Sequence, residues 1–333
     1  MFLLMFNKLR FVGSLSAVFL ALTCATPAFT QSWPLDRPIK IVVPYPPGGS
    51  ADSIPRLLAV HLSARLGRNV IVENVAGGSG NIGTLQVVKA APDGHTIVLA
   101  ATPLSTNPSF YRDLPFDVLK DLAPITMITR QQFVLVTHPS LPVKTVPELI
   151  ALAKSRPGQL TFASHSAGGA THLAGELFKV LSGVDILHVP YKGQAPAVND
   201  LVAGHVSMLF DSASTAMTHT EAGKLRALAT TGPNRTPLVA KGSLPTMAEF
   251  KGMESFNVLA WFGFMAPAGT PAPIVERLSR EIGEVLRLPE VTQRLNTMGF
   301  EVVGTTPDAF STHIRTEVAK WAKLVKDSGA KLD

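Results

Sequence analysis

Two glycine-rich turns are the parts of this sequence whose residues are best suited to binding an anion. The first covers residues 45–52 (YPPGGSAD) and the second residues 77–83 (GGSGNIG). Each lies between a short β-branched run and a helical pattern, so unhindered backbone N–H groups lie beside the positive end of a helix dipole. Neither turn contains arginine or lysine. We therefore expect backbone N–H groups and water to bind the anion.

A third turn, residues 164–172 (SHSAGGATH), has the same position between a strand and a helix. Its hydroxyl groups, imidazoles and glycine N–H groups can bind a second polar end of the same ligand. For one isolated turn, the simpler interpretation is that glycine only permits tight backbone geometry. Three such turns at the carboxyl ends of predicted strands favour a shared ligand site.

Three side chains near these turns have both a structural and a ligand-binding interpretation, and the sequence leaves both open. Asp52 either contacts a ligand or complements the dipole of the helix that begins there. Asp211 follows the strand expected at 206–210, where it either accepts a hydrogen bond from a ligand amine or hydroxyl or caps the next helix together with Ser212. Tyr191 forms either a wall of the site or ordinary packing at a strand end.

The motifs of common enzyme classes are absent from this sequence or incomplete in it. Residues 78–83 match the dinucleotide fingerprint G-x-G-x-x-G, but the next expected strand ends in Ala-Ala-Thr at 100–102, without the acidic residue that binds a ribose. The sequence has no G-x-S-x-G elbow, no phosphate loop and no H-E-x-x-H motif, and its histidines have no comparable ligand spacing. We therefore expect no metal and no cofactor. A serine hydrolase stays open, because Ser, His and Asp converge in space and not in sequence.

Composition indicates an ordered globular protein. Hydrophobic residues make up 46% of the 333 residues and charged residues 16%, which excludes an intrinsically disordered chain. The net charge is only +6 and the basic residues are scattered along the chain. We therefore expect no nucleic-acid partner.

The first 28 residues have the layout of a secretory signal peptide. Lys8 and Arg10 precede an uncharged apolar stretch at 11–25, and cleavage is expected after Ala28. An uncleaved membrane anchor is the alternative, but the apolar stretch is short for a bilayer span. Cleavage removes Cys24, the only cysteine, and with it disulfides, thiol catalysis and cysteine-bound metals. We expect an exported, periplasmic protein.

Alternating strand and helix patterns predict an α/β fold of two domains. Strands are expected at 39–43, 70–72, 96–100, 133–136, 160–163, 186–189, 206–210, 225–229 and 258–265. Helices are expected from about 52 to 66, through 82–88, and at 146–155, 172–181, 195–202, 273–286 and 307–328. Successive βα units favour parallel sheets, and the carboxyl ends of both sets of strands then border a ligand cleft between the domains.

Several ordered motifs resemble the Bug family of extracytoplasmic solute receptors, which serve tripartite tricarboxylate transporters. They are YPPGGSAD at 45–52, EN at 73–74, GNIG at 80–83, APDG at 91–94, HLAGE at 172–176, VPYKG at 189–193, APA at 195–197 and GKLRAL at 223–228. The resemblance runs from near Trp33 to the C-terminus. It implies a two-domain periplasmic-binding-protein (type II) fold, with residues 33–133 and 256–333 in domain 1 and residues 134–255 in domain 2.

The resemblance implies a binding protein and not an enzyme. A small carboxylate-bearing ligand is captured as the two domains close, and the receptor, a monomer, delivers it to a membrane permease of a tripartite tricarboxylate transporter. The candidate ligand-binding residues are Tyr45, Pro47, Gly48, Gly49, Asp52, Gly78, Gly80, Asn81, Thr102, Ser164, His165, Ser166, Gly168, Thr171, Tyr191 and Asp211. The family often has a simpler turn of small residues where this chain has Ser164-His165-Ser166, and an imidazole there either donates to a distal carboxylate or stacks on a ring.

Two other functions stay open from the sequence. An exported hydrolase would act through Ser166, Asp211 and either His165 or His172. A receptor of the same fold would instead signal to a sensor kinase. The identity of the ligand does not follow from the resemblance, because one fold serves many substrates.

Overall fold

The computed structural model of the protein describes residues 33, 34 and 36–330. The signal peptide predicted at residues 1–28 lies outside the described residues. Among the helices of the described part, none is both long enough and apolar enough to cross a membrane.

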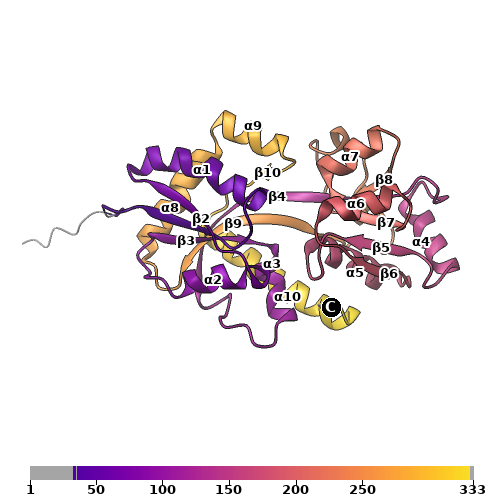
Figure 1. Cartoon of the computed structure of the whole chain (residues 1–333), viewed down its shortest axis with the longest axis horizontal. Coiled ribbons are helices and arrows are strands. Elements are labelled where there is room, and N and C mark those ends of the chain that lie inside the picture. Colours follow the sequence, from indigo (N-terminus) through magenta and orange to yellow (C-terminus); the bar gives the residue numbers. More distant parts are fainter. Residues whose placement is uncertain (1–32, 35, 331–333) are drawn as a thin grey trace, which may run out of the picture. The chain divides into compact units, whose positions relative to one another are not determined.

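The first parallel strands place the first two glycine turns at one edge of the sheet. β1 (Ile39–Val43) lies between β2 (Val70–Asn74) and β3 (Thr96–Ala101), and the three strands are parallel. α1 (Ser50–Leu66) follows β1, and α2 (Asn81–Val88) follows β2 (Figure 1). This confirms the strand–turn–helix order predicted for both turns. Because parallel strands end at the same edge of a sheet, the two turns are neighbours.

A second parallel group carries the third turn. It contains β5 (Thr161–Ser164), β6 (Leu187–Pro190) and β7 (Met208–Ser212), with β5 in the middle. In the chain, α4 (Val146–Ser155) precedes β5, α5 (Ala170–Ser182) follows it, and α6 (Gln194–Val202) follows β6 (Figure 1). The residues that follow β5 and β6 therefore lie at the same sheet edge as the end of β7.

One long strand connects the two parallel groups. The first part of β4 (Leu122–Thr137) pairs antiparallel with β9 (Leu259–Pro267), and its last residues, from Phe133, pair with β7 and β8 (Arg226–Thr230). β9 also pairs with β3, so the strand order is β2-β1-β3-β9-β4-β7-β5-β6. The sheet is therefore mixed and not wholly parallel.

The first part of β4 corrects the sequence analysis, which predicted a strand only at 133–136. Pro124 and the polar residues before Phe133 are atypical of a buried strand. In the structure the polar side chains have tertiary partners. Arg130 donates two hydrogen bonds to the carboxylate of Glu301 in β10 (Glu301–Val302), the strand that pairs with β4 at this point.

The sequence does not predict three of the helices, α3 (Thr102–Phe110), α7 (Ala213–Glu221) and α9 (Pro289–Thr297). Each has only nine residues, and few of its buried positions are large and apolar, so its helical period is weak. The predicted helices near the C-terminus are confirmed as α8 (Ala272–Leu286) and α10 (Pro307–Ser328). Short 3₁₀ turns occur at η1 (Gly78–Gly80), η2 (Ala240–Gly242) and η3 (Met247–Glu249).

The C-terminal helix α10 contributes to two hydrophobic clusters. Phe310 and Ile314, in its first half, pack with buried residues of β1, β3 and β9. Trp321 and Leu324, in its second half, pack with buried residues of β5, α5 and β7. Burial of these side chains therefore joins α10 to both parallel groups of strands.

Two histidines and a phenylalanine stack beside the third turn. Phe162 of β5 and His188 of β6 are partners across the two strands, and their ring centroids lie 4.8 Å apart. His172 of α5 stacks on His188, with centroids 3.8 Å apart and an interplanar angle of 8°. Gly175 makes room for the stack, because a Cβ at that position would lie 2.1 Å from the Phe162 ring.

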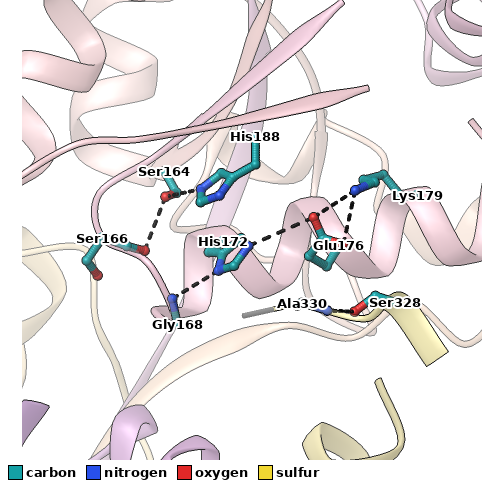
Figure 2. A network of polar contacts seen from close by, with 9 residues as sticks. All are labelled: Ser164, Ser166, Gly168, His172, Glu176, Lys179, His188, Ser328 and Ala330. Carbon is teal, nitrogen blue, oxygen red and sulfur yellow. Dashed lines mark hydrogen bonds and ion pairs between the residues drawn. The ribbon is translucent and has the colours of Figure 1, made fainter. Parts of the chain in front are cut away.

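The stacked histidines hold the backbone of the third turn. The Gly168 N–H donates to His172 Nδ1 at 2.9 Å (Figure 2). The Ser164 hydroxyl donates to the Ser166 carbonyl at 3.1 Å and lies 2.7 Å from His188 Nε2. The single proton of the Ser164 hydroxyl is donated to the Ser166 carbonyl. His188 Nε2 is therefore the donor in its bond with the Ser164 oxygen.

His172 is neutral in the folded protein. An imidazole that accepts the Gly168 N–H through Nδ1 carries its proton on Nε2, which lies 3.9 Å from Glu176 Oε1. Burial, followed by the nearby His188 and Lys179, lowers the pKa of His172 to about 3. The neutral ring is therefore a structural support of the turn.

Substitution of Gly175 by alanine should destabilise the fold, because the new Cβ overlaps the Phe162 ring. Overpacking of this kind costs about 1–3 kcal/mol in the free energy of unfolding. Gly283→Ala is the matched control, since Gly283 lies in α8 and a Cβ there meets nothing within 4 Å. The control should gain about 0.5–1 kcal/mol. Urea unfolding measures both, and an equal stability of the two variants would contradict the packing described here.

Replacement of His172 by asparagine, which does not titrate, should make the free energy of unfolding less dependent on pH in the acid range. Below pH 6.5 the unfolded chain protonates His172, whereas the folded chain does so only near pH 3. The contribution to stability is therefore complete above pH 6.5 and is lost as the pH falls, by about 1.4 kcal/mol per pH unit within this window. His172→Asn retains an acceptor for the Gly168 N–H and does not titrate.

Urea unfolding across this pH window, on the wild type and His172→Asn, measures the effect. The variant should lose less stability on acidification than the wild type. His205→Asn, which changes an exposed histidine, should retain the wild-type dependence. If the His172→Asn and wild-type curves are parallel, His172 is not held neutral.

Candidate functional site

The first glycine turn presents backbone donors at the start of α1. Gly49 is the N-cap residue of α1, and no side chain caps this end of the helix. The N–H groups of Ser50 and Ala51 have no acceptor among the described residues. The predicted site residues Pro47, Gly48 and Gly49 are exposed beside them. Unpaired N–H groups at a helix start, next to exposed glycines, are suited to binding an anion.

Asp52 supports the first turn from inside. Its Oδ2 accepts the Gly48 N–H at 3.1 Å, and its Oδ1 accepts Arg56 Nε at 2.8 Å and Asn74 Nδ2 at 3.0 Å. Only 7% of the residue is exposed. Burial acts to raise the pKa of Asp52, but the bonds from Gly48, Asn74 and Arg56 outweigh it and hold that pKa below its ordinary value. These contacts favour the structural interpretation of Asp52.

Asn74, at the end of β2, joins the first turn to the second. Its Nδ2 also donates to the Tyr45 carbonyl at 3.1 Å, and its Oδ1 accepts Arg56 Nη2 at 2.7 Å. The Tyr45 side chain covers Gly80, where a Cβ would lie 3.3 Å from the tyrosine hydroxyl oxygen. Burial raises the pKa of Tyr45. The structure thus brings the first two turns together. Asn74 is a site residue that the sequence analysis did not predict, although its position before a glycine turn was a usable signal.

The second turn is held by α3. Asn107 Nδ2 donates to the Ser79 carbonyl at 3.1 Å and to Asn81 Oδ1 at 2.7 Å. Ser79 has a φ of 54°, in the left-handed region that non-glycine residues rarely adopt, between Gly78 and Gly80, which also have positive φ. Asn107 therefore stabilises an unusual backbone. No local pattern indicates this role of Asn107, because α3 itself is not predicted from the sequence.

The third glycine of the G-x-G-x-x-G match packs a helix against the sheet. A Cβ at Gly83 would lie 2.7 Å from the Val75 carbonyl and 2.9 Å from Pro44 Cβ. Close helix–strand packing explains this glycine without a dinucleotide.

Thr102, a predicted site residue, is buried at the start of α3. Its Oγ1 accepts the Trp261 N–H at 3.3 Å, and its carbonyl accepts the Ser105 hydroxyl at 2.8 Å. The side chain therefore connects the end of β3 to β9, and these contacts support a structural role.

The third turn is bonded to the segment that follows β6. Ser164 is the last residue of β5 and is buried, which corrects its predicted place in the turn itself. Its carbonyl accepts the Tyr191 N–H at 3.0 Å, and the His165 carbonyl accepts the Gly193 N–H at 2.8 Å. The His165 N–H donates to Thr171 Oγ1 at 3.0 Å. The backbone of His165 is therefore fixed on both sides.

Ser166 and Gly168 lie farther along the same turn. Ser166 is exposed, and its carbonyl accepts the Gly169 N–H at 3.3 Å. Gly168 is buried and has a φ of 70°. Its N–H donates to His172 Nδ1. Gly169 is the N-cap of α5 and has no side-chain cap. The turn thus offers an exposed hydroxyl beside an uncapped helix start.

Asp211 lies inside β7 and not after it, which corrects the sequence analysis. It is fully buried. Its Oδ1 accepts the Ser212 N–H at 2.8 Å and Gln194 Nε2 at 2.7 Å, and it lies 3.1 Å from His165 Nε2. Ser212 is the N-cap of α7, but its side chain makes no capping bond, so the capping interpretation is not supported. Gln194, the first residue of α6, is a further polar residue that the sequence did not indicate.

The Tyr191 hydroxyl is hydrogen-bonded to a residue of the following helix, α6. The hydroxyl donates to Asp200 Oδ2 at 2.6 Å. Burial and this bond raise the pKa of Tyr191 to about 12. The contacts favour packing at a strand end over a free donor in the site.

Among the described residues, no hydrogen bond joins the Ser166 hydroxyl to a histidine ring. His172 Nδ1 accepts the Gly168 N–H and is not available as a base. The hydroxyl bonded to His188 belongs to Ser164, which is buried and donates to the Ser166 carbonyl. In the same part of the chain, no group of three or more His, Cys, Asp or Glu side chains is placed to bind a metal ion.

The relation between the third turn and the first two stays a prediction. No hydrogen bond between them occurs within the described part of the chain. A cavity of about 390 Å³ lies elsewhere, lined by residues that include Arg130, Arg235 and Glu301 and none of the predicted site residues. The first two turns lie next to each other, and the third turn lies beside the buried Asp211.

Comparisons with known proteins place this geometry in a family. The model of the tripartite tricarboxylate transporter family receptor (TctC) matches residues 54–330. Protein BugT of Bordetella pertussis (strain Tohama I) is 38% identical over 328 residues, which cover 98% of this chain and 99% of the relative.

Two solved structures are similar over most of their length. The R. palustris protein Rpa4515, solved with adipate, is 36% identical with a TM-score of 0.76, covering 90% of this chain and 99% of that one. The periplasmic binding protein BugD is 34% identical with a TM-score of 0.73, covering 89% and 99%. The resemblance drawn from the motifs and the solute-binding fold are both confirmed. This chain belongs to the tripartite tricarboxylate transporter receptor family, whose members include the Bug proteins.

Proposed function

We propose that this protein is a periplasmic solute-binding protein that captures a small organic acid and delivers it to the permease of a tripartite tricarboxylate transporter. Membership of the receptor family supports the transport role. The adipate bound to Rpa4515 supports a carboxylate ligand, and the periplasmic location of BugD agrees with the predicted signal peptide.

The observation that carries the proposal is the pair of glycine turns held together by Asn74 and Tyr45. The N–H groups at the start of α1 are unpaired among the described residues, and the second turn lies beside them. The charge of Asp52 is balanced by Arg56, so it does not oppose an incoming carboxylate. Backbone donors at helix starts then bind one carboxylate of the ligand.

The third turn binds the other end of the ligand when the two domains close. Domain 1 contains residues 33–133 and 256–333, and domain 2 contains residues 134–255. The change in the pairing of β4, from β9 to β7 and β8, supports a boundary near Phe133. Closure is driven by the contacts that the ligand makes only in the closed state.

The receptor acts as a monomer, without a cofactor or metal, and does not catalyse a reaction. His172 Nδ1 accepts the Gly168 N–H, and the Ser164 hydroxyl donates to the Ser166 carbonyl. These bonds support binding over hydrolysis. A fluorophosphonate probe should leave Ser166 unmodified, as measured by mass spectrometry. Labelling of Ser166 would support a hydrolase instead.

Isothermal titration against mono-, di- and tricarboxylates, terephthalate and acidic amino acids tests the ligand class. At least one acid should bind, and the neutral amide of that acid should bind far more weakly, because it carries no anion for the backbone donors. Failure of every acid to bind would contradict the proposed function.

Gly49→Val tests the first turn directly. Gly49 has a φ of −91° and a Cβ there meets nothing within 4 Å, so the variant should fold. The free energy of unfolding should fall by no more than about 1 kcal/mol. Its side chain should obstruct the approach of the carboxylate and lower affinity by about tenfold or more. Gly283→Val, in α8, is the control and should bind normally; unchanged affinity in Gly49→Val would make the turn a scaffold only.

A further inference from the structure

The cavity of about 390 Å³ is lined by residues of both predicted domains and by none of the predicted site residues. Domain 1 contributes Asn296 of α9, Glu301 of β10 and Arg130 of β4. Domain 2 contributes the segment 233–238, which follows β8. Small-molecule sites in proteins have volumes of this order and commonly lie between domains. The cavity is therefore a candidate for a second binding site.

The start of the segment 233–238 is held in place by Gln132 of β4. The Gln132 Oε1 accepts the Gly232 N–H at 3.2 Å, and its Nε2 donates to the Asn234 carbonyl at 2.8 Å. A Cβ at Gly232 would lie 2.3 Å from Gln132 Cδ, so the segment and the strand pack closely. This part of the cavity wall is therefore fixed by packing and hydrogen bonds.

The charges of the lining favour a ligand with one negative charge. Arg130 and Arg235 carry two positive charges and Glu301 carries one negative charge, which leaves a surplus of one positive charge in the lining. Glu249, whose two carboxylate oxygens accept hydrogen bonds from Arg235, is not part of the lining. Both oxygens of Glu301 accept hydrogen bonds from Arg130, so this carboxylate is already paired and does not attract a cation.

Several hydrogen-bond donors of the lining have no partner in the described part of the chain. Arg130 donates to Glu301 through Nε and Nη2, which leaves Nη1 without a hydrogen bond there. The side-chain amides of Asn234 and Asn296 are exposed and make no hydrogen bond to other described residues. Because water can bond to these groups, they stay available to an oxygen of a ligand.

Apolar side chains complete the lining. Leu238 keeps 38% of its surface exposed, although large apolar side chains are usually buried. Leu259 of β9 and Val302 of β10 are half-buried and also line the cavity. A ligand with an apolar body gains by covering this surface.

We propose that this cavity is a second binding site, which takes a small organic anion with one charged group and an apolar body. The carboxylate or sulfonate of the anion accepts hydrogen bonds from Arg130 Nη1 and from the amides of Asn234 and Asn296. Its apolar body covers Leu238 and Leu259. The site is separate from the glycine turns, so the anion is an effector and not the transported acid.

Occupancy of this cavity should oppose domain closure, a consequence that rests on the proposed function. No hydrogen bond joins the third turn to the first two within the described residues, so closure has to move the domains from the present arrangement. An anion that contacts both walls of the cavity binds best when those walls keep their present separation. It therefore stabilises the present arrangement and lowers the affinity for an acid that binds by closure.

Ligand-observed NMR titration of the Gly49→Val variant tests the site, because the proposed carboxylate site at the first turn is obstructed in that variant. The probes are 4-(trifluoromethyl)benzoate, octanoate and benzenesulfonate. At least one of them should bind to both the wild type and Gly49→Val. The neutral amide of that probe should bind about tenfold more weakly or less, because it lacks the charge that Arg130 attracts.

Variants assign the binding to the cavity. Asn296→Trp places a large ring in the cavity from an exposed position of α9 and should lower probe affinity about tenfold or more. Gln293→Trp, at an exposed position of the same helix outside the lining, is the matched control and should bind normally. Arg130→Met combined with Glu301→Met removes the charged pair together and should abolish the preference for the anion over its amide. Urea unfolding checks the fold of each variant.

The effect on closure is measured by titrating an organic acid that binds the wild type, with and without a saturating concentration of the probe. The probe should lower the affinity for the acid about fivefold or more. In Asn296→Trp the probe should no longer have this effect. If it lowers the affinity equally in that variant, the probe competes at the glycine turns and the coupling is wrong.

The outcomes distinguish this inference from the proposed function. Absence of probe binding, or binding that Asn296→Trp leaves unchanged, would overturn the second site. Binding to the wild type that is lost in Gly49→Val would place the probe at the first turn, which overturns the inference and supports the proposed function. Equal binding of the anion and its amide would overturn the class of ligand. Failure of every organic acid to bind, by contrast, would contradict the proposed function and leave the probe titrations of Asn296→Trp to decide the second site.

Discussion

Buried polar groups at the three turns need hydrogen-bond partners, because an unpaired one costs roughly 1–3 kcal/mol. Asp52 meets this requirement by accepting the Gly48 N–H and the side chains of Arg56 and Asn74. His172 meets it by accepting the Gly168 N–H. These inward bonds fix the shape of the turns, whereas N–H groups at the exposed helix starts can bond to water and stay available to a ligand.

The same requirement determines which charges act at the site. Arg56 is bonded to Asp52 and Asn74, and Lys179 is bonded to Glu176, so these charges balance one another within the protein. Asp211 is different, because one of its oxygens has no partner among the described residues. His165 Nε2 lies 3.1 Å from the other oxygen of this carboxylate, Oδ1.

Elements with strong local patterns were predicted well, and elements supported by tertiary partners were not. The strand Ile39–Val43 and the helix Pro307–Ser328 have clear apolar periods and appear at the predicted residues. The first half of β4 contains a proline and a polar run, and it is a strand because β9 and β10 pair with it. Likewise, α3 buries mostly polar residues, so its sequence carries little helical period.

The sequence by itself determined the glycine turns, their places between strands and helices, and the family, because these follow from local backbone preferences and ordered motifs. Only the tertiary structure decided which polar side chains support the turns. Asn74, Asn107 and Gln194 act through partners far away in the chain, at distances that no local pattern encodes. It also showed that Asp211 is buried against His165, since burial depends on how strands and helices pack.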